Sequence, residues 1–215
     1  MLTVFHGSSV EVITPNLKYS EDLTDFGKSF YVTSDQNMAE RWAANKIIAV
    51  ISEYNFDDAG LSCKRFGVDA EWLDFISRNR RPDRYNDSKL PPVSSFPVVI
   101  GPTADDRMFK ILNRYFDGEL SSEMTLRCLS AVPIGEQIAI KEQNILDTRL
   151  KFVASYTLDK EAVINRKQAS KSAREYVNDQ IDAFLRGEFS ERELNRKLCT
   201  APNNSLDSGE CLWKT

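Results

Sequence analysis

The residues most able to do chemistry lie at the beginning of this 215-residue chain, around its single histidine. Leu2–Phe5 is an apolar run typical of a short strand, so we expect His6 at the end of that strand. Gly7 interrupts the pattern and lets a ligand approach the backbone, whose N–H and C=O can bind a planar carboxamide. Ser8 adds a hydroxyl group. A lone histidine is more often structural than catalytic, so its neighbours must decide the interpretation.

A second group of candidate residues, Lys28, Phe30 and Tyr31, follows a polar loop and begins a β-prone run. Residues 35 to 44 then predict a helix, which carries Trp42 eleven residues after Tyr31. Two electron-rich rings can sandwich a cationic pyridinium, because the ring faces carry negative charge density. A core position in an amphipathic helix is an equally good interpretation of Trp42.

Two blocks of the sequence, His-Gly-Ser at residues 6–8 and Phe-Gly-Lys-Ser-Phe-Tyr at residues 26–31, resemble a known family. They are similar to the His-Gly-Ser and Phe-Gly-Lys-Gly-x-Tyr blocks of poly(ADP-ribose) polymerases and related diphtheria-toxin-like ADP-ribosyltransferases. The resemblance implies that NAD is the substrate and that Lys28 and Phe30 belong to its binding site. It also implies a role for each remaining candidate: a ribose hydroxyl bonds to His6, the nicotinamide amide to Gly7 and Ser8, and the nicotinamide ring lies between Tyr31 and Trp42.

The chain departs from the polymerase pattern at two positions. Ala39 stands where the polymerases place a serine that bonds the nicotinamide amide, so that bond is missing or supplied elsewhere. Ser29 replaces the glycine before the aromatic pair, which narrows the approach to Tyr31.

A longer stretch, roughly residues 2 to 155, is similar to an uncharacterised bacterial family thought to share the ADP-ribosyltransferase fold. The similarity rests on Phe-His-Gly-Ser, Asp-Phe-Gly-Lys-x-Phe-Tyr, Val-Ile-Gly-Pro-x-Ala-Asp-Asp and a late Gln-Ile strand. Members often lie beside a small partner gene, which implies a toxin with a small antitoxin-like protein partner.

Cleavage of NAD develops positive charge on the ribose, so a nearby anion or hydrogen-bond acceptor should stabilise the transition state. The resemblance aligns Glu136, on a predicted strand over residues 136–140, with the polymerase glutamate. Adjacent strand residues point to opposite faces, so only one of Glu136 and Gln137 can face a cleft. We expect Ile138 to mark the core face and Gln137 to mark the ligand face, with Glu136 as the alternative through a bulge.

Further acidic residues fall within the resemblance. Asp105 and Asp106 follow the Gly101-Pro102 turn and either bind the acceptor or, more in keeping with their position, cap a helix. Asp25 precedes the Phe-Gly-Lys block, and orienting Lys28 is one role for it that the sequence leaves open.

The elements that must position these residues predict an α+β fold with flanking helices and a C-terminal helical extension. The resemblance implies that its core is an ADP-ribosyltransferase-like split β-sheet. Strands are expected near residues 46–56, 98–100 and 149–156, with helices over 68–79, 105–116 and 121–130. From about Lys160 a charged helix has apolar positions every three or four residues, and Gly187 should end it. We therefore divide the chain into an NAD-binding domain, residues 1–158, and a helical extension and tail, residues 159–215.

Composition narrows the functional classes. No run of about 18 apolar residues could span a membrane, and the four scattered cysteines with one histidine predict no metal site. The composition therefore favours a cytoplasmic protein. The resemblance implies a mono-ADP-ribosyltransferase that uses NAD to modify an unknown macromolecular acceptor, protein or nucleic acid. The alternatives are an NAD glycohydrolase, with water as acceptor, and an inactive NAD-binding or interaction module.

Overall fold

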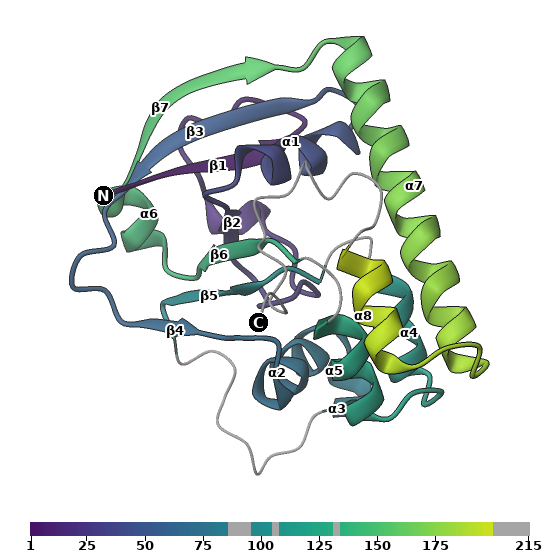
Figure 1. Cartoon of the computed structure of the whole chain (residues 1–215). Coiled ribbons are helices and arrows are strands. Elements are labelled where there is room, and N and C mark those ends of the chain that lie inside the picture. The colour runs from purple at the N-terminus through teal and green to yellow at the C-terminus, as the bar shows by residue number, and fades with distance from the viewer. Residues whose placement is uncertain (86–95, 105–107, 131–133, 200–215) are drawn as a thin grey trace.

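The computed structural model describes residues 1–85, 96–104, 108–130 and 134–199, and within them the chain forms two β-sheets and eight α-helices (Figure 1). The strands are β1 Leu2–Ser8, β2 Phe30–Val32, β3 Val50–Phe56, β4 Cys63–Arg65, β5 Val98–Pro102, β6 Glu136–Ile140 and β7 Leu150–Thr157. The helices are α1 Gln36–Ala44, α2 Ala70–Arg80, α3 Pro82–Tyr85, α4 Phe109–Phe116, α5 Ser122–Ser130, α6 Gln143–Arg149, α7 Lys160–Leu185 and α8 Glu191–Cys199. This arrangement is of the α+β class. Asp105 and Asp106 lie outside the described residues.

The two sheets have the strand orders β1-β3-β7 and β2-β6-β5-β4. The first sheet is antiparallel throughout, whereas the second contains one parallel pair, β4 with β5. A single antiparallel bridge between Phe5 and Thr33 joins β1 to β2, with hydrogen bonds of 2.8 and 3.0 Å between their backbone groups. The sheets therefore meet at the strands that carry His6 and Tyr31.

The prediction that Gly7 ends the first strand is wrong. β1 continues to Ser8, and His6 pairs with Ser52 inside the ladder. Glycine is required at position 7 of the strand because helix α1 packs so closely on β1 that no side chain would fit there.

The predicted strand over residues 46–56 begins later, at Val50. Ile47 and Ile48 are exposed, so their apolar character does not mark a buried strand. Short apolar runs do not by themselves distinguish a buried strand from an exposed connection.

The expectation of one core face and one open face on β6 is also wrong. Ile138 and Ile140 belong to one hydrophobic cluster, and Ala139 on the opposite face is fully buried in another. Helices cover the Ala139 face, so both faces of this strand are buried. Alternation of polar and apolar residues therefore gave no information about a ligand-facing wall.

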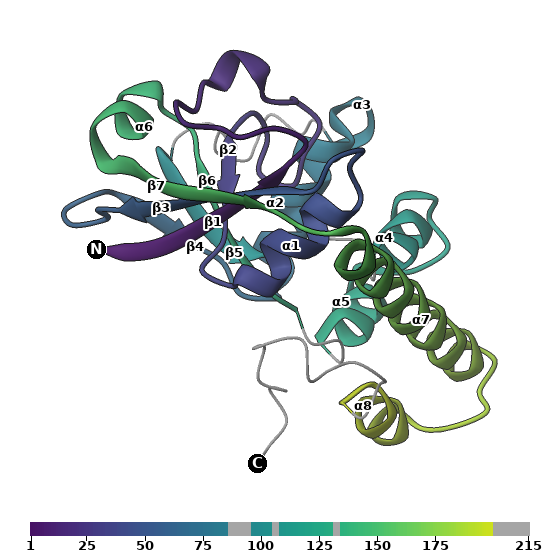
Figure 2. The same ribbon diagram turned by 90° about the horizontal axis from the view of Figure 1, so that it is seen from above.

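The C-terminal helices α7 and α8 contribute to one of these two hydrophobic clusters. Val177 and Ile181 of α7 and Leu194 and Leu198 of α8 belong to the hydrophobic cluster that contains Trp72 of α2. Helix α7 runs along one side of the molecule, from the end of β7 past α1 to α4 and α5 (Figure 2). The predicted helical extension therefore packs against the preceding domain.

The predicted end of the long helix is confirmed. Gly187 follows α7 with a φ of 77°, a conformation that glycine adopts without strain. Before α8, Ser190 and Glu193 form a capping box, with the Ser190 N–H donating to Glu193 at 2.9 Å.

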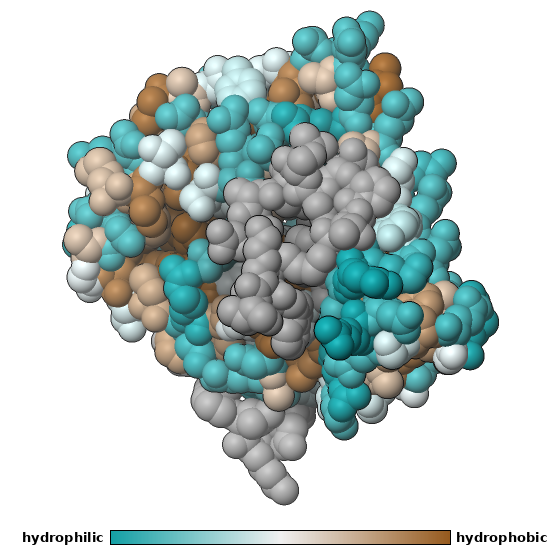
Figure 3. Space-filling model, in the orientation of Figure 1, coloured by the Kyte–Doolittle hydropathy of each residue, from teal (hydrophilic) through white to brown (hydrophobic). Residues whose placement is uncertain are grey.

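The surface of α8 is strongly hydrophilic on the face shown in Figure 3, in keeping with its charged sequence. None of the helices in the described ranges is both long enough and apolar enough to cross a membrane.

Candidate functional site

The candidate site begins where β1 and β2 separate. Antiparallel pairing of Phe5 with Thr33 would place Gly7 opposite Tyr31 if the ladder continued. Instead, the Nδ1 atom of His6 lies 2.7 Å from the carbonyl oxygen of Tyr31. The His6 ring thus bonds to the Tyr31 carbonyl, which would have bonded to the Gly7 backbone if the ladder had continued.

This contact fixes the hydrogen-bonding roles of the His6 ring. A carbonyl only accepts, so Nδ1 must carry the proton and donate it. Burial lowers the pKa of His6 to about 4, against the effect of the bond to Tyr31, and the charge of Lys46 lowers it further. The ring is therefore neutral at physiological pH, and its Nε2 lone pair is left to accept a hydrogen bond from a ligand.

The backbone of Gly7 turns toward the same gap. Along a strand, the backbone N–H and C=O groups of every second residue point to the same side. Those of Phe5 bond to Thr33, just after β2, so those of Gly7 also point away from β3. A Cβ atom on Gly7 would lie 2.0 Å from the carbonyl oxygen of Ala39 and 2.8 Å from the amide nitrogen of Ala43. Glycine is therefore required by α1 as well as favourable for a ligand.

Ala39 is fully buried in the hydrophobic cluster where α1 packs on β1, so its small side chain is part of the core.

Tyr31 is held by its hydroxyl. That group accepts from the Phe26 N–H at 2.9 Å and lies within 2.9 Å of the Gly27 carbonyl and 2.8 Å of the Thr24 hydroxyl. Burial raises the pKa of Tyr31, so the phenol stays protonated and able to donate. Since the polar end is engaged by the preceding loop, Tyr31 contributes its ring to the site.

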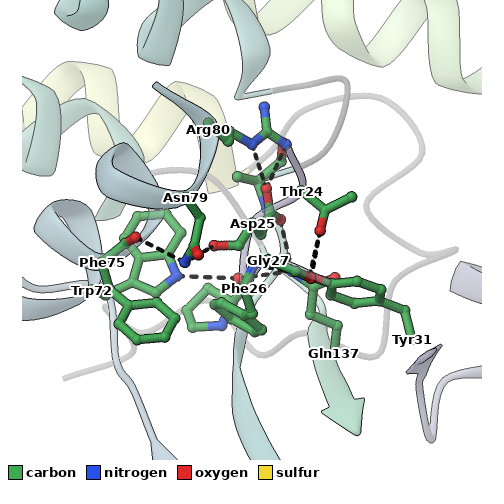
Figure 4. A network of polar contacts seen from close by, with 12 residues as sticks. Thr24, Asp25, Phe26, Gly27, Tyr31, Trp72, Phe75, Asn79, Arg80 and Gln137 are labelled. Atoms are coloured by element: carbon green, nitrogen blue, oxygen red, sulfur yellow. Dashed lines mark hydrogen bonds and ion pairs between the residues drawn. The ribbon is translucent and has the colours of Figure 1, made fainter. Parts of the chain in front are cut away.

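The loop that holds Tyr31 is itself anchored by the buried Asp25 (Figure 4). The Asp25 carboxylate accepts from the Arg80 guanidinium at 2.6 Å, from the Ala104 N–H at 2.7 Å and from the Gln137 amide at 2.7 Å. Arg80 and Ala104 are also joined directly, at 2.9 Å. The Asp25 carboxylate therefore bonds to Arg80 of α2, and the open possibility that it orients Lys28 is not what the structure shows.

Two further side chains fix the same loop by its backbone. Asn79 donates to the Asp25 carbonyl at 3.1 Å, and Lys141 donates to the Phe26 carbonyl at 2.6 Å. Burial lowers the pKa of Lys141. The loop before Tyr31 is thus a rigid support bonded to α2, β6 and the segment after β5.

A pocket of about 760 Å³ opens at the gap between β1 and β2. This volume lies in the range typical of small-molecule sites. Its lining combines five of the predicted residues with the loops that follow β1 and precede β2, namely His6, Gly7, Ser8, Phe30, Tyr31, residues 9–14, Asn16, Tyr19, Ser20, Glu21, Thr24, Ser29 and Lys46.

Four predicted residues do not line this pocket. Trp42 is half-buried on α1 and Lys28 is exposed. Glu136 is exposed and pairs with Arg65, while Gln137 is buried against Asp25. Five of the predicted residues thus line one pocket. The predicted second aromatic and both candidates for the third catalytic position lie outside its lining.

Sequence reasoning missed pocket residues that come from loops. Tyr19 exposes most of its ring at the pocket, and Lys18 lies 4.6 Å from the centre of that ring. Glu11, Glu21 and Lys46 supply charges. The only signal in the sequence was the presence of an aromatic and carboxylates in the polar stretch between His6 and Phe26, and their placement depends on how the loop folds back.

The described residues contain no group of three His, Cys, Asp or Glu side chains that could hold a metal ion.

Comparison with known proteins gives a family without an assigned activity. Residues 2–152 match the model of a family described as "protein of unknown function (DUF3990)". No curated protein and no solved structure matches the chain. The match includes every strand that lines or supports the pocket and ends inside β7. Because it covers more than half of the chain, this protein belongs to the DUF3990 family.

Proposed function

We propose that this protein binds NAD in the pocket between β1 and β2 and transfers its ADP-ribose to a macromolecular acceptor, with release of nicotinamide. The observation that carries the proposal is the arrangement at the strand gap. The Gly7 N–H and C=O turn toward it, and the adjacent His6 is fixed as a neutral ring with Nε2 as an acceptor. A carboxamide complements the first pair of groups, and a ribose hydroxyl complements the second.

The fold supports this proposal in outline. Two small sheets joined by one bridge, with the site at their junction, are what a split β-sheet core of the ADP-ribosyltransferase type would require. The buried loop that holds the Tyr31 ring is a second supporting feature, since a platform for a planar ring must be rigid to be effective.

The reaction would break the bond between the ribose carbon and the nicotinamide nitrogen, with the electron pair leaving on the nitrogen. Neutral nicotinamide departs, and a lone pair of the acceptor forms the new bond to the ribose carbon. In this scheme Gly7 and Tyr31 orient the leaving group, and His6 fixes the sugar by one of its hydroxyls.

One observation favours a second candidate, an NAD-binding module without catalysis. Glu136 and Gln137, the two residues expected to support the transition state, both lie outside the pocket lining. Such a module would bind NAD and release no nicotinamide.

The test is to incubate the purified protein with NAD labelled on the adenylate, in the presence of a cell lysate. We expect free nicotinamide together with label retained on macromolecules, and digestion with nuclease or protease would then identify the acceptor class. The His6→Ala variant is the control and should abolish both signals while its circular dichroism spectrum stays unchanged.

The other outcomes are equally informative. Release of nicotinamide without retained label, repeated with several lysates, would favour hydrolysis of NAD by water. Binding of NAD without release would favour the binding module, and wild-type activity in the His6→Ala protein would exclude this site.

A further inference from the structure

Two carboxylates, Glu11 and Glu21, line the pocket in the described part of the chain. Both lie in the connection between β1 and β2, and neither belongs to the motifs that carry the family resemblance. They differ in how they are held. Both residues are exposed, but the Glu11 carboxylate accepts a hydrogen bond from the Ser155 hydroxyl of β7.

The backbone next to Glu11 is fixed as firmly as its side chain. The Val12 N–H donates to the Ser52 hydroxyl at 3.1 Å, and the buried Tyr54 donates to the Val12 carbonyl. Strands β3 and β7 thus determine where the Glu11 carboxylate lies. A charge that is positioned before the reaction stabilises a transition state far better than one that must be ordered during it.

The sheet register relates this carboxylate to His6. His6 pairs with Ser52, and Ser52 pairs with Ser155, so the three side chains form one row on the same face of the sheet. With strands about 4.8 Å apart, the row spans roughly 10 Å from His6 to Ser155. A ligand that lies across this face can contact both the His6 ring and the carboxylate bonded to Ser155.

We propose that Glu11 is the catalytic carboxylate of this pocket: it faces the ribose carbon of bound NAD, stabilises the positive charge that develops there, and takes the proton of the attacking acceptor. The inference rests on the proposed function. In the balanced step, the bond from the ribose carbon to nicotinamide breaks with its electron pair leaving on nitrogen. The acceptor oxygen or nitrogen forms the new bond, and its proton passes to Glu11 and then to solvent.

The structure also gives the reason to prefer Glu11 over the residues expected from the sequence. Glu136 is engaged by Arg65, and Gln137 carries no charge and is bonded to Asp25. Glu11, by contrast, lines the pocket, and the hydrogen bond to its carboxylate comes from an uncharged hydroxyl group.

The experiment compares Glu11→Gln with Glu175→Gln, which removes one charge from an exposed position on α7 outside the pocket lining. For each purified protein we would measure the dissociation constant for NAD by calorimetry and the rate of nicotinamide release. We expect Glu11→Gln to bind NAD within about threefold of wild type and to release nicotinamide about 10² to 10³ times more slowly. Glu175→Gln should stay within about threefold in both measurements, and Ser155→Ala should give an intermediate loss of rate.

The outcomes separate this inference from the proposed function. If wild type releases nicotinamide and Glu11→Gln matches its rate, Glu11 is not the catalytic carboxylate and the proposed function stands. If wild type binds NAD and releases none, the transferase fails and the role of Glu11 with it. A Glu11→Gln protein that loses NAD binding and rate in equal proportion would show a binding role and would also overturn the inference. Melting temperatures of all four proteins check that each variant is folded.

Discussion

At the scale of the residue, the His6 ring carries out two tasks with two nitrogens. Nδ1 bonds the Tyr31 carbonyl and so prevents β1 and β2 from closing into a continuous ladder, while Nε2 keeps a lone pair for the pocket. Burial of the ring keeps it neutral, which makes the division of tasks stable across physiological pH.

The first prediction concerns the charge state of His6. Because the chain has one histidine, its ring C–H signals in an NMR titration need no assignment by mutation. We expect the folded protein to show a pKa near 4 and the urea-unfolded protein a value near 6.5. A folded-state value at or above 6.5 would show that the ring is not buried as described.

The same shift makes stability depend on pH. The unfolded state binds a proton more readily than the folded state, so the stability from neutral His6 is fully present above pH 6.5 and is lost as pH falls toward 4. The difference corresponds to roughly 3 kcal/mol. In urea denaturation, wild type should therefore lose more stability than His6→Gln between pH 6.5 and 4, and curves that stay parallel would contradict the argument.

Asp25 shows how a buried charge can serve the site without touching a ligand. Asp25→Asn should destabilise the protein on the order of 3 to 5 kcal/mol, because Arg80 would be left largely buried without its counter-charge. Asp83→Asn, which breaks an exposed pair with Arg81, is the matched control and should change stability little. Urea denaturation measures both, and equal effects would show that burial does not decide the outcome.

At the scale of the element, the tightest constraint on the site is the packing of α1 on β1. Gly7→Ala would drive a methyl group into the helix backbone, since the nearest atoms are the Ala39 carbonyl and the Ala43 amide. We expect a loss of about 1 to 3 kcal/mol in unfolding free energy, or more if α1 cannot shift. Gly67→Ala, whose nearest neighbour would be an Asp69 side-chain atom at 3.6 Å, is the control and should be nearly neutral.

Most elements could be predicted from the sequence because their signals are local. The helix containing Trp42 and the helix ended by Gly187 each have a capping residue and a periodic apolar face, and both lie close to where they were expected. Strand β6 matches its predicted range. The helix α6 and the strand β4 were missed, since each is short and has no strong pattern of its own.

The composition of the pocket was less predictable, for a physical reason. His6 and Tyr31 could be identified because each lies in or beside a β-prone run, next to a glycine or an aromatic residue that limits the local structure. Glu11 is positioned by Ser155, which is 144 residues away in the sequence, and such a pairing leaves no local signal. The burial of Gln137 likewise follows from the helices that cover its face, which strand periodicity does not reveal.

At the scale of the whole molecule, the helices α7 and α8 complete a core that begins in the family-matched region. Both contribute fully buried residues to the largest hydrophobic cluster, and Arg166 of α7 pairs with the buried Glu40 of α1. The boundary at residue 158 predicted from composition therefore separates two sequence patterns that share one hydrophobic core.

This shared core gives a prediction about truncation. A chain ending at residue 158 loses Val177, Ile181, Leu194 and Leu198 and exposes the apolar surfaces that they cover. Each buried aliphatic side chain contributes about 1.5 to 3 kcal/mol, so the shortened protein should be unfolded or aggregated at 25 °C. A truncated protein with cooperative thermal unfolding near the wild-type temperature would show that residues 1–158 fold independently.

The Asp25 carboxylate also has a consequence for the order in which the protein folds. Its three side-chain and backbone partners lie 55, 79 and 112 residues further along the chain, so it cannot leave water until distant segments have come together. The loop beneath the Tyr31 ring should therefore become ordered late, after the helices that form from local contacts. The Ala104 amide, which donates to Asp25, is a direct reporter: in pulsed hydrogen exchange during refolding, we expect its protection to appear in the last kinetic phase, together with competence to bind a ligand.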